Sequence, residues 1–202
     1  LTVGSVADLV GGYVNPAGVV VSSFSGFGPT DDGRIKPDLT ANGELLTSSS
    51  NVVNNGYAAL SGTSMATPSV AGSLNLLVER HNQLYGTNRA MLASTLKGLA
   101  IHTADETGSF PGPDYRYGWG LMNTRTAALL IDSNYQSQAL ANIKEVILNN
   151  GDFIEFPVVA TNTRPLKVTI CWTDPPGTPP LAAVDPTNRM LVNDLDLRVI
   201  RG

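Results

Sequence analysis

One serine, Ser64, stands among residues too small to cover it, in the stretch of residues 61–72. Gly62 allows a tight approach of the backbone, and Ser61 or Thr63 is a candidate N-cap. An apolar run with helical spacing follows, so the sequence predicts that a helix begins here. The Ser64 N–H is then a first-turn amide at the positive end of the helix dipole. The stretch thus predicts an exposed hydroxyl at a helix N-terminus. A nucleophilic serine needs this exposure and a nearby N–H donor.

Residues 62–72 resemble the nucleophile motif of the subtilisin-like serine proteases, the subtilases. Three further stretches are similar to segments of this family and occur in the family's order. They are the strand at residues 1–6, the connecting segment at 22–38 and the turn at 117–123. The resemblance implies an α/β fold for residues 1–132, namely the later part of a subtilisin-like parallel-sheet three-layer domain.

The activity that this resemblance implies is that of a serine endopeptidase. Ser64 is then the catalytic nucleophile, and Gly62, Thr63 and Met65 form the substrate-binding rim around it. Proteins or peptides are the expected substrates, and the expected location is extracellular or at the cell surface. The chemistry itself requires no cofactor, although structural calcium is common in the family.

The histidines do not match the family's triad, which runs Asp, His, Ser along the chain. His81 and His102 both follow Ser64, and the family's oxyanion asparagine belongs further upstream than this sequence extends. His81 lies 17 positions after Ser64 on the same predicted helix, which places it about 25 Å away. We therefore expect a fragment that is nearly inactive alone. Its truncated sheet edge and helix faces favour self-association.

Composition excludes several other classes of protein. The 202 residues include 13 Lys and Arg against 17 Asp and Glu, so the net charge of −4 argues against nucleic acid as a partner. No apolar run is long enough to span a membrane. Cys171 is the only cysteine, which excludes an internal disulfide and a cysteine-based zinc site.

Hydrophobic periodicity predicts an α/β segment followed by an all-β segment from residue 133 onward. The predicted strands of the first segment are residues 1–6 and 19–24, with a polar loop region up to residue 55. The predicted helices are 63–84, 88–101 and 123–131. Asn88 and Asn123 are the candidate N-caps of the last two, and Gly86 is a candidate stop for the first.

Residues 133–202 contain three strand-like runs, at 153–161, 166–173 and 191–200. The second and third resemble a β-sandwich (jelly-roll) domain that follows the catalytic domain in some bacterial subtilases, here incomplete. Asp194 and Asp196 point the same way from a strand and are candidate calcium ligands. Two carboxylates fall short of the six to eight oxygens that calcium prefers, and Arg198 shares their face, so an arginine-paired polar face is the alternative.

Two other functions also fit the sequence. One is a non-catalytic subtilase relative that serves as a peptide-binding, adhesion or structural module. Another is a carbohydrate-binding protein that uses its β-rich part. The Ser-x-x-Lys pattern at residues 94–97 lacks the companion elements of penicillin-binding enzymes, and an α/β-hydrolase needs an acid and then a histidine after its serine.

Overall fold

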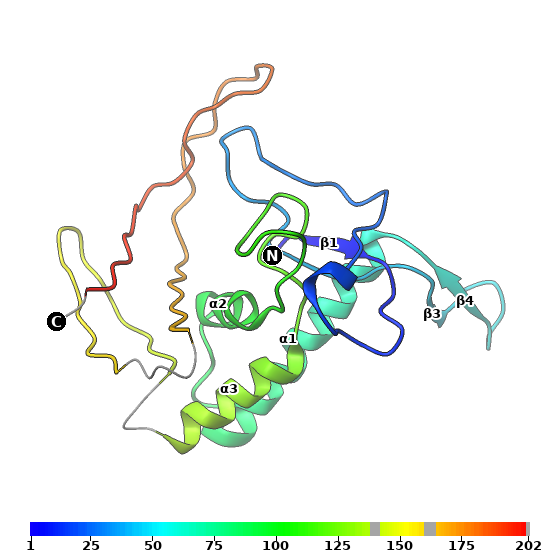
Figure 1. Cartoon of the computed structure of the whole chain (residues 1–202), viewed down its shortest axis with the longest axis horizontal. Helices are drawn as coiled ribbons and strands as arrows, with labels where there is room; N and C mark the ends of the chain where they lie inside the picture. The colour runs from blue at the N-terminus through cyan, green and yellow to red at the C-terminus, as the bar shows by residue number, and fades with distance from the viewer. Residues whose placement is uncertain (138–141, 160–164, 201–202) are drawn as a thin grey trace.

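A computed structural model describes residues 1–137, 142–159 and 165–200. Figure 1 shows a mixed α/β body with long irregular segments to one side and a projecting hairpin to the other. In chain order the elements are β1 (Val3–Val6), the 3-10 turn η1 (Pro16–Gly18), β2 (Leu39–Asn42), β3 (Leu46–Ser49), β4 (Tyr57–Leu60), α1 (Thr63–Tyr85), α2 (Ala93–Thr103) and α3 (Thr124–Gln136).

The centre of the body is a parallel pair of strands. β1 pairs with β2 from Val3 opposite Leu39 to Val6 opposite Asn42. The loop before α3 adds a third segment to this pair. Thr40 of β2 forms a parallel bridge with Leu121, and its carbonyl accepts a hydrogen bond from the Met122 N–H. All four residues of β1 are buried, as expected for a parallel strand covered on both faces. The predicted parallel-sheet α/β architecture is confirmed.

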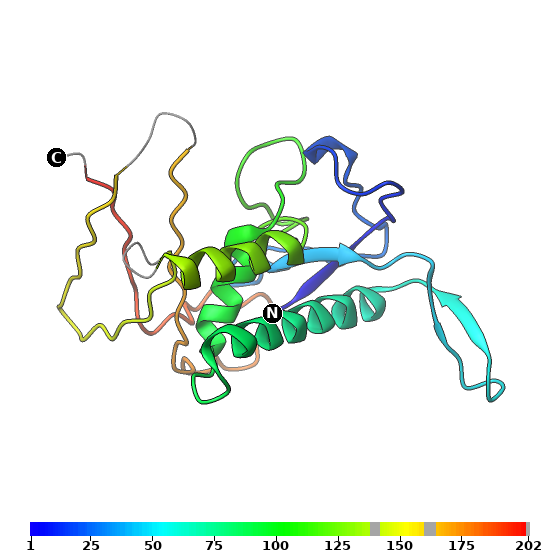
Figure 2. The ribbon, with the colours of Figure 1, turned by 90° about the horizontal axis from the view of Figure 1, so that it is seen from below.

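The long helix α1 packs on this sheet through its small and branched residues. Ala66 and Val70 belong to the buried cluster that contains Val3 and Leu39. Further along, Leu77 belongs to a second cluster, which α2 and α3 complete with Leu99, Ala127 and Ile131. Figure 2 shows α1 and α3 running beside the strands. The sheet therefore fixes the first half of α1, and the other helices fix the second half.

Most helix boundaries follow from the sequence. α1 begins at Thr63, one residue after its N-cap Gly62, and Gly86 is its C-cap. Asn123 caps α3, since its side-chain oxygen accepts a hydrogen bond from the Thr126 N–H at 2.8 Å. The expected cap at Asn88 is wrong, because α2 begins only at Ala93.

Strand prediction fails between residues 19 and 60. The predicted strand at 19–24 is wrong: it contributes only an isolated antiparallel bridge between Val21 and Val6. Conversely, the region expected to be a polar loop up to residue 55 contains β2 and β3, and the unpredicted strand β4 follows it. These strands have four residues each and carry Thr, Ser, Asn and Ala, so they give little hydrophobic alternation.

Within residues 142–159 and 165–200 the structure has no helix or strand. In the run at 166–173 the predicted inner face is not buried: Leu166, Val168 and Ile170 are between 41% and 46% exposed, whereas Thr169 and Cys171 are partly buried. A β-strand is held by backbone hydrogen bonds to a neighbouring strand. Among the described residues, no segment forms such a pair with residues 166–173. Part of the run at 153–161 lies outside the described residues. The β-sandwich stays a prediction.

Candidate active site

Ser64 is the second residue of α1, and its side chain is exposed. Gly62 forms the helix entrance, with its carbonyl accepting the N–H groups of Met65 at 3.0 Å and Ala66 at 3.3 Å. Ala66 is fully buried and anchors this turn in the core. Hence the helix presents Ser64 to solvent from a turn that is fixed on its inner side.

The entrance of α1 has no side-chain cap. The predicted caps are therefore wrong: Thr63 is already helical, and Ser61 accepts a hydrogen bond from the Leu45 N–H at 2.9 Å instead. In the part of the chain that the structure describes, neither the Thr63 N–H nor the Ser64 N–H has an acceptor. There is also no acidic residue in the first turn. These amides at the positive end of a 23-residue helix can stabilise an anion.

A contact between Gly43, which follows β2, and Gly62 sets the position of the first turn of α1. The Gly62 N–H donates to the Gly43 carbonyl at 2.7 Å, and the Gly43 N–H donates to the Val6 carbonyl at 3.1 Å. Ser5 closes the space on the other side, with its hydroxyl 2.8 Å from that of Ser22. A Cβ atom on Gly43 would lie 2.7 Å from the Gly62 carbonyl oxygen and closer still to Ser5 Oγ. The ends of β1 and β2 thus hold the first turn of α1.

The predicted rim residues surround Ser64 along the chain. Gly62, Thr63 and Met65 are all partly buried. The Thr63 carbonyl accepts from Thr67 Oγ1 at 2.9 Å. Their roles in substrate binding stay predictions.

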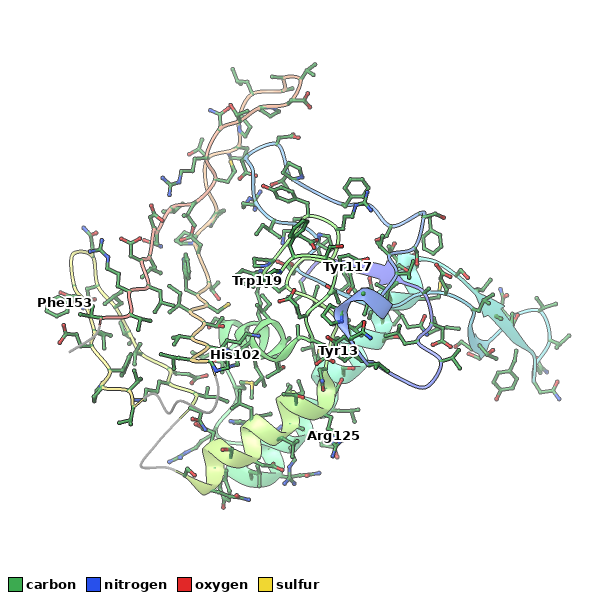
Figure 3. All side chains as sticks on the ribbon, in the orientation of Figure 1. Tyr13, His102, Tyr117, Trp119, Arg125 and Phe153 are labelled. Carbon is green, nitrogen blue, oxygen red and sulfur yellow. The ribbon has the colours of Figure 1, made fainter. Side chains whose placement is uncertain are left out.

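Neither histidine can serve as the base for Ser64. His81 lies in the last turns of α1, about 25 Å along the helix from Ser64, and it stacks on Tyr85 with ring centroids 4.5 Å apart. His102 lies at the end of α2 (Figure 3), and its Nδ1 is 2.9 Å from the Thr169 hydroxyl. Burial, and secondarily the charge of Lys167, lowers the pKa of His102. Among the described residues, no titratable group hydrogen-bonds Ser64.

Asp38 is a buried acid before Ser64 with a structural role. Its carboxylate accepts the Thr2 N–H at 2.6 Å and both oxygens lie 2.8 Å from the Lys36 ammonium, with Lys97 at 3.6 Å. Burial alone would raise the pKa of this carboxyl, but the hydrogen bonds from Lys36 and Thr2 and the two lysine charges outweigh it and lower the pKa. Asp38 therefore joins the start of β1 to β2 and α2.

Two hollows border α1, and neither contains Ser64. One, of about 420 Å³, lies where β1 and β2 end, and Ser69 and Ser73 line it. At 100° per residue these serines are about 140° and 180° around the helix from Ser64. The other, of about 670 Å³, lies along residues 75–87. Neither of these two hollows has Ser64 among its lining residues.

The predicted calcium ligands are both exposed and lie near arginines. Asp194 is 2.6 Å from Arg189, and Asp196 is 3.6 Å from Arg198. Across residues 1–137, 142–159 and 165–200 no group of three or more His, Cys, Asp or Glu is placed to hold a metal ion. Two carboxylates supply too few oxygens for calcium, so no chemistry is assigned to a metal here. Calcium binding stays a prediction.

A model of the subtilase family matches residues 1–120, which include Ser64, Gly43 and the sheet that holds them. This chain belongs to the subtilase family. The match covers more than half of the sequence and ends just before the cap of α3. Within the described residues, no helix has the length and apolar character needed to cross a membrane.

Individual subtilases agree with this assignment. The C5a peptidase of Streptococcus pyogenes serotype M6 is 49% identical over 154 residues, which are 72% of this chain and 12% of that protein. The PII-type proteinase of Lacticaseibacillus paracasei is 33% identical over 156 residues, 74% of this chain and 8% of that protein. The structure of the CspB protease of Clostridium perfringens matches 64% of this chain and 26% of its own, with 28% identity and a TM-score of 0.50. This chain spans about a tenth of the two curated relatives.

Proposed function

We propose that this chain carries the nucleophile of a subtilisin-like serine endopeptidase, and that Ser64 is that nucleophile. The observation that carries the proposal is the exposed Ser64 hydroxyl at the second position of α1, on a turn fixed by Gly43. Membership of the subtilase family and the names of its relatives, a peptidase and a proteinase, support the same reaction.

In the proposed reaction, Ser64 Oγ attacks the carbonyl carbon of a peptide bond. A C–O bond forms, the hydroxyl proton passes to a histidine outside this chain, and that histidine then protonates the departing amine. An aspartate, also outside this chain, orients the histidine. Water hydrolyses the resulting ester and regenerates the Ser64 hydroxyl. Without the base, Ser64 stays a neutral alcohol, so the isolated chain has almost no activity.

This chain's own contribution is the placement of the oxygen and a share of the anion stabilisation. The Ser64 N–H lies at the helix N-terminus and is free to donate to the oxyanion. Gly62, Thr63 and Met65 border the substrate at this point. We propose protein or peptide substrates and an extracellular site of action, in keeping with the family's secreted members.

A fluorophosphonate probe tests the proposal on the full-length protein. The serine oxygen displaces fluoride from phosphorus, so an activated Ser64 becomes covalently labelled. We expect label on the peptide that contains Ser64, loss of label in Ser64→Ala and full label in the neighbouring Ser61→Ala. An unlabelled, folded full-length protein would contradict the proposal.

The second candidate function is that of a non-catalytic subtilase that only binds peptides. It is favoured by one observation, namely that no titratable group among the described residues contacts Ser64. The same probe separates the two functions, because a non-catalytic relative gives no label although its rim remains able to bind peptide.

A further inference from the structure

The β3–β4 hairpin projects away from the body of the molecule (Figures 1 and 2). Its strands pair only with each other among the described residues, from Leu46 opposite Leu60 to Ser49 opposite Tyr57. Both outer edges therefore present unpaired backbone groups. Edges of this kind accept an additional extended chain.

The hairpin and the first half of α1 carry no charge. From Leu45 to Val78, a stretch of 34 residues, there is no Asp, Glu, Lys, Arg or His. At the chain's average of 15% charged residues, about five would be expected. Exposed edge strands usually carry charged side chains, which prevent unwanted pairing. This hairpin lacks them.

Five large apolar side chains of the hairpin are exposed to solvent. Val52 is 83% exposed, Leu45 75% and Tyr57 74%. Val53 and Leu60 are more than half exposed as well. Apolar side chains gathered on one exposed element mark an interaction surface more often than scattered ones do. The surface is thus suited to an uncharged, extended partner.

This surface is continuous with the proposed nucleophile. Leu60 ends β4 four residues before Ser64. Ser61 accepts a hydrogen bond from the Leu45 N–H, which ties the base of the hairpin to the entrance of α1. A chain lying along the hairpin therefore arrives at the Ser64 hydroxyl.

We propose that the β3–β4 hairpin is a docking surface for the polypeptide substrate, which it binds as an extended, uncharged, apolar segment next to the scissile bond. This rests on the proposed function, and it names the substrate class. Backbone hydrogen bonds along a hairpin edge supply affinity, and burial against Val52, Val53 and Tyr57 selects apolar side chains. Charged side chains are disfavoured, because burying an unpaired charge is costly.

The test compares a long and a short substrate on the full-length protein. An extended chain rises about 3.3 Å per residue, so eight residues on one side of the scissile bond span about 26 Å, whereas a four-residue strand of the hairpin spans about 13 Å. The long substrate has eight uncharged Val, Thr and Ser residues on each side of the bond, and the short one has two. The variant is Val52→Asp with Val53→Asp. The control is Val10→Asp, which adds charge at a residue that is 94% exposed elsewhere.

We expect the hairpin variant to lower kcat/KM for the long peptide at least about tenfold and to leave the short peptide unchanged. Val10→Asp changes neither. Val52→Thr with Val53→Thr, which keeps the shape without charge, gives an intermediate loss on the long peptide. Equal effects on both peptides, or none on the long one, overturn the proposal.

A binding measurement separates this proposal from the proposed function. Fluorescence polarisation of the labelled long peptide is measured with full-length Ser64→Ala, with and without the hairpin substitutions. Binding that is weakened about tenfold by the substitutions supports the hairpin even if the probe fails to label Ser64. If the substitutions leave peptide binding unchanged and convert a dimer to a monomer in light scattering, the surface binds a second copy, and the proposal is wrong.

Discussion

Replacing Gly43 by alanine is expected to displace Ser64 without touching it. The new Cβ would lie 2.7 Å from the Gly62 carbonyl oxygen, whereas ordinary contacts begin at 3.4 Å. Gly62 must therefore retreat by about 0.7 Å. The Cβ would lie closer still to Ser5 Oγ, and because Ser5 is fully buried and hydrogen-bonded to Ser22, the backbone at Gly43 and Gly62 takes up the strain. Since the Gly62 carbonyl binds the N–H groups of the first turn, that turn moves with it.

The size of the effect follows from this displacement. A misplacement of about 1 Å at a reacting atom can cost about 100-fold in rate. For a shift of about 0.7 Å we expect Gly43→Ala to lower kcat by about 10-fold to 100-fold. Overpacking also costs about 1–3 kcal/mol in the free energy of unfolding. We expect KM for a short peptide to change less than kcat, because the displaced rim keeps all of its side chains.

The assay is steady-state hydrolysis of a short peptide by the full-length protein, with circular dichroism and thermal melting to show that each variant is folded. Gly26→Ala is the matched control, because no heavy atom lies within 4 Å of the added Cβ. Wild-type kcat in a folded Gly43→Ala protein would refute the claim that the glycine contact positions the nucleophile.

The remaining predictions concern stability and ionisation. Asp38→Asn should lower the free energy of unfolding by about 3 kcal/mol, because two lysines lose a buried partner. Because the pKa of Asp38 is lowered in the folded state, the wild type should lose this stability as the pH falls below the ordinary value of 3.8. The Asn variant should show no such loss. Denaturant melts at several pH values measure the difference. Leu77→Ala should cost about 3 kcal/mol in the same melts, against under about 0.5 kcal/mol for the exposed Leu129→Ala. By NMR, the pKa of His102 should lie below 6.5, and it should rise in Lys167→Gln. Because the pKa is lowered in the folded state, the folded protein should lose stability as the pH falls from 6.5 toward that pKa.

The sequence predicts best those elements that bury a regular face. α1 is correct at its start and within one residue at its end, because apolar residues recur with helical spacing up to Val78 and Gly86 then ends the helix. Asn123 is correct as a cap because its side chain has the short reach that capping needs. Asn88 has the same side chain, but no helix forms until Ala93, so a cap residue alone does not fix a helix start.

The strands β3 and β4 were not predictable from periodicity. Their side chains are Thr, Ser, Ala, Leu and Tyr in an exposed hairpin, so burial imposes no alternation on them. Pairing between the two strands holds them instead, and that is a non-local property. The available sequence signal was the Asn54-Asn55-Gly56 turn between two runs without charge.

The candidate site was predicted in part. Ser64 at the mouth of α1 follows from the small residues around it and from the helix that comes after. The contact between Gly62 and Gly43 could not be predicted, because it joins residues that are distant in sequence and depends on how β2 ends. The sequence predicts Ser61 or Thr63 as the cap of this helix, but the Ser61 hydroxyl accepts a hydrogen bond from the Leu45 N–H, which the hairpin brings close to it.

Trapping the acyl-enzyme tests the central claim most directly. Full-length protein is mixed with a peptide p-nitrophenyl ester, quenched in acid within milliseconds to seconds, and analysed by intact mass and peptide mapping. We expect one added acyl group per molecule, attached to the Ser64 side chain and absent from Ser64→Ala. An acyl group on another residue, or turnover of the ester with undiminished rate in Ser64→Ala, would contradict it.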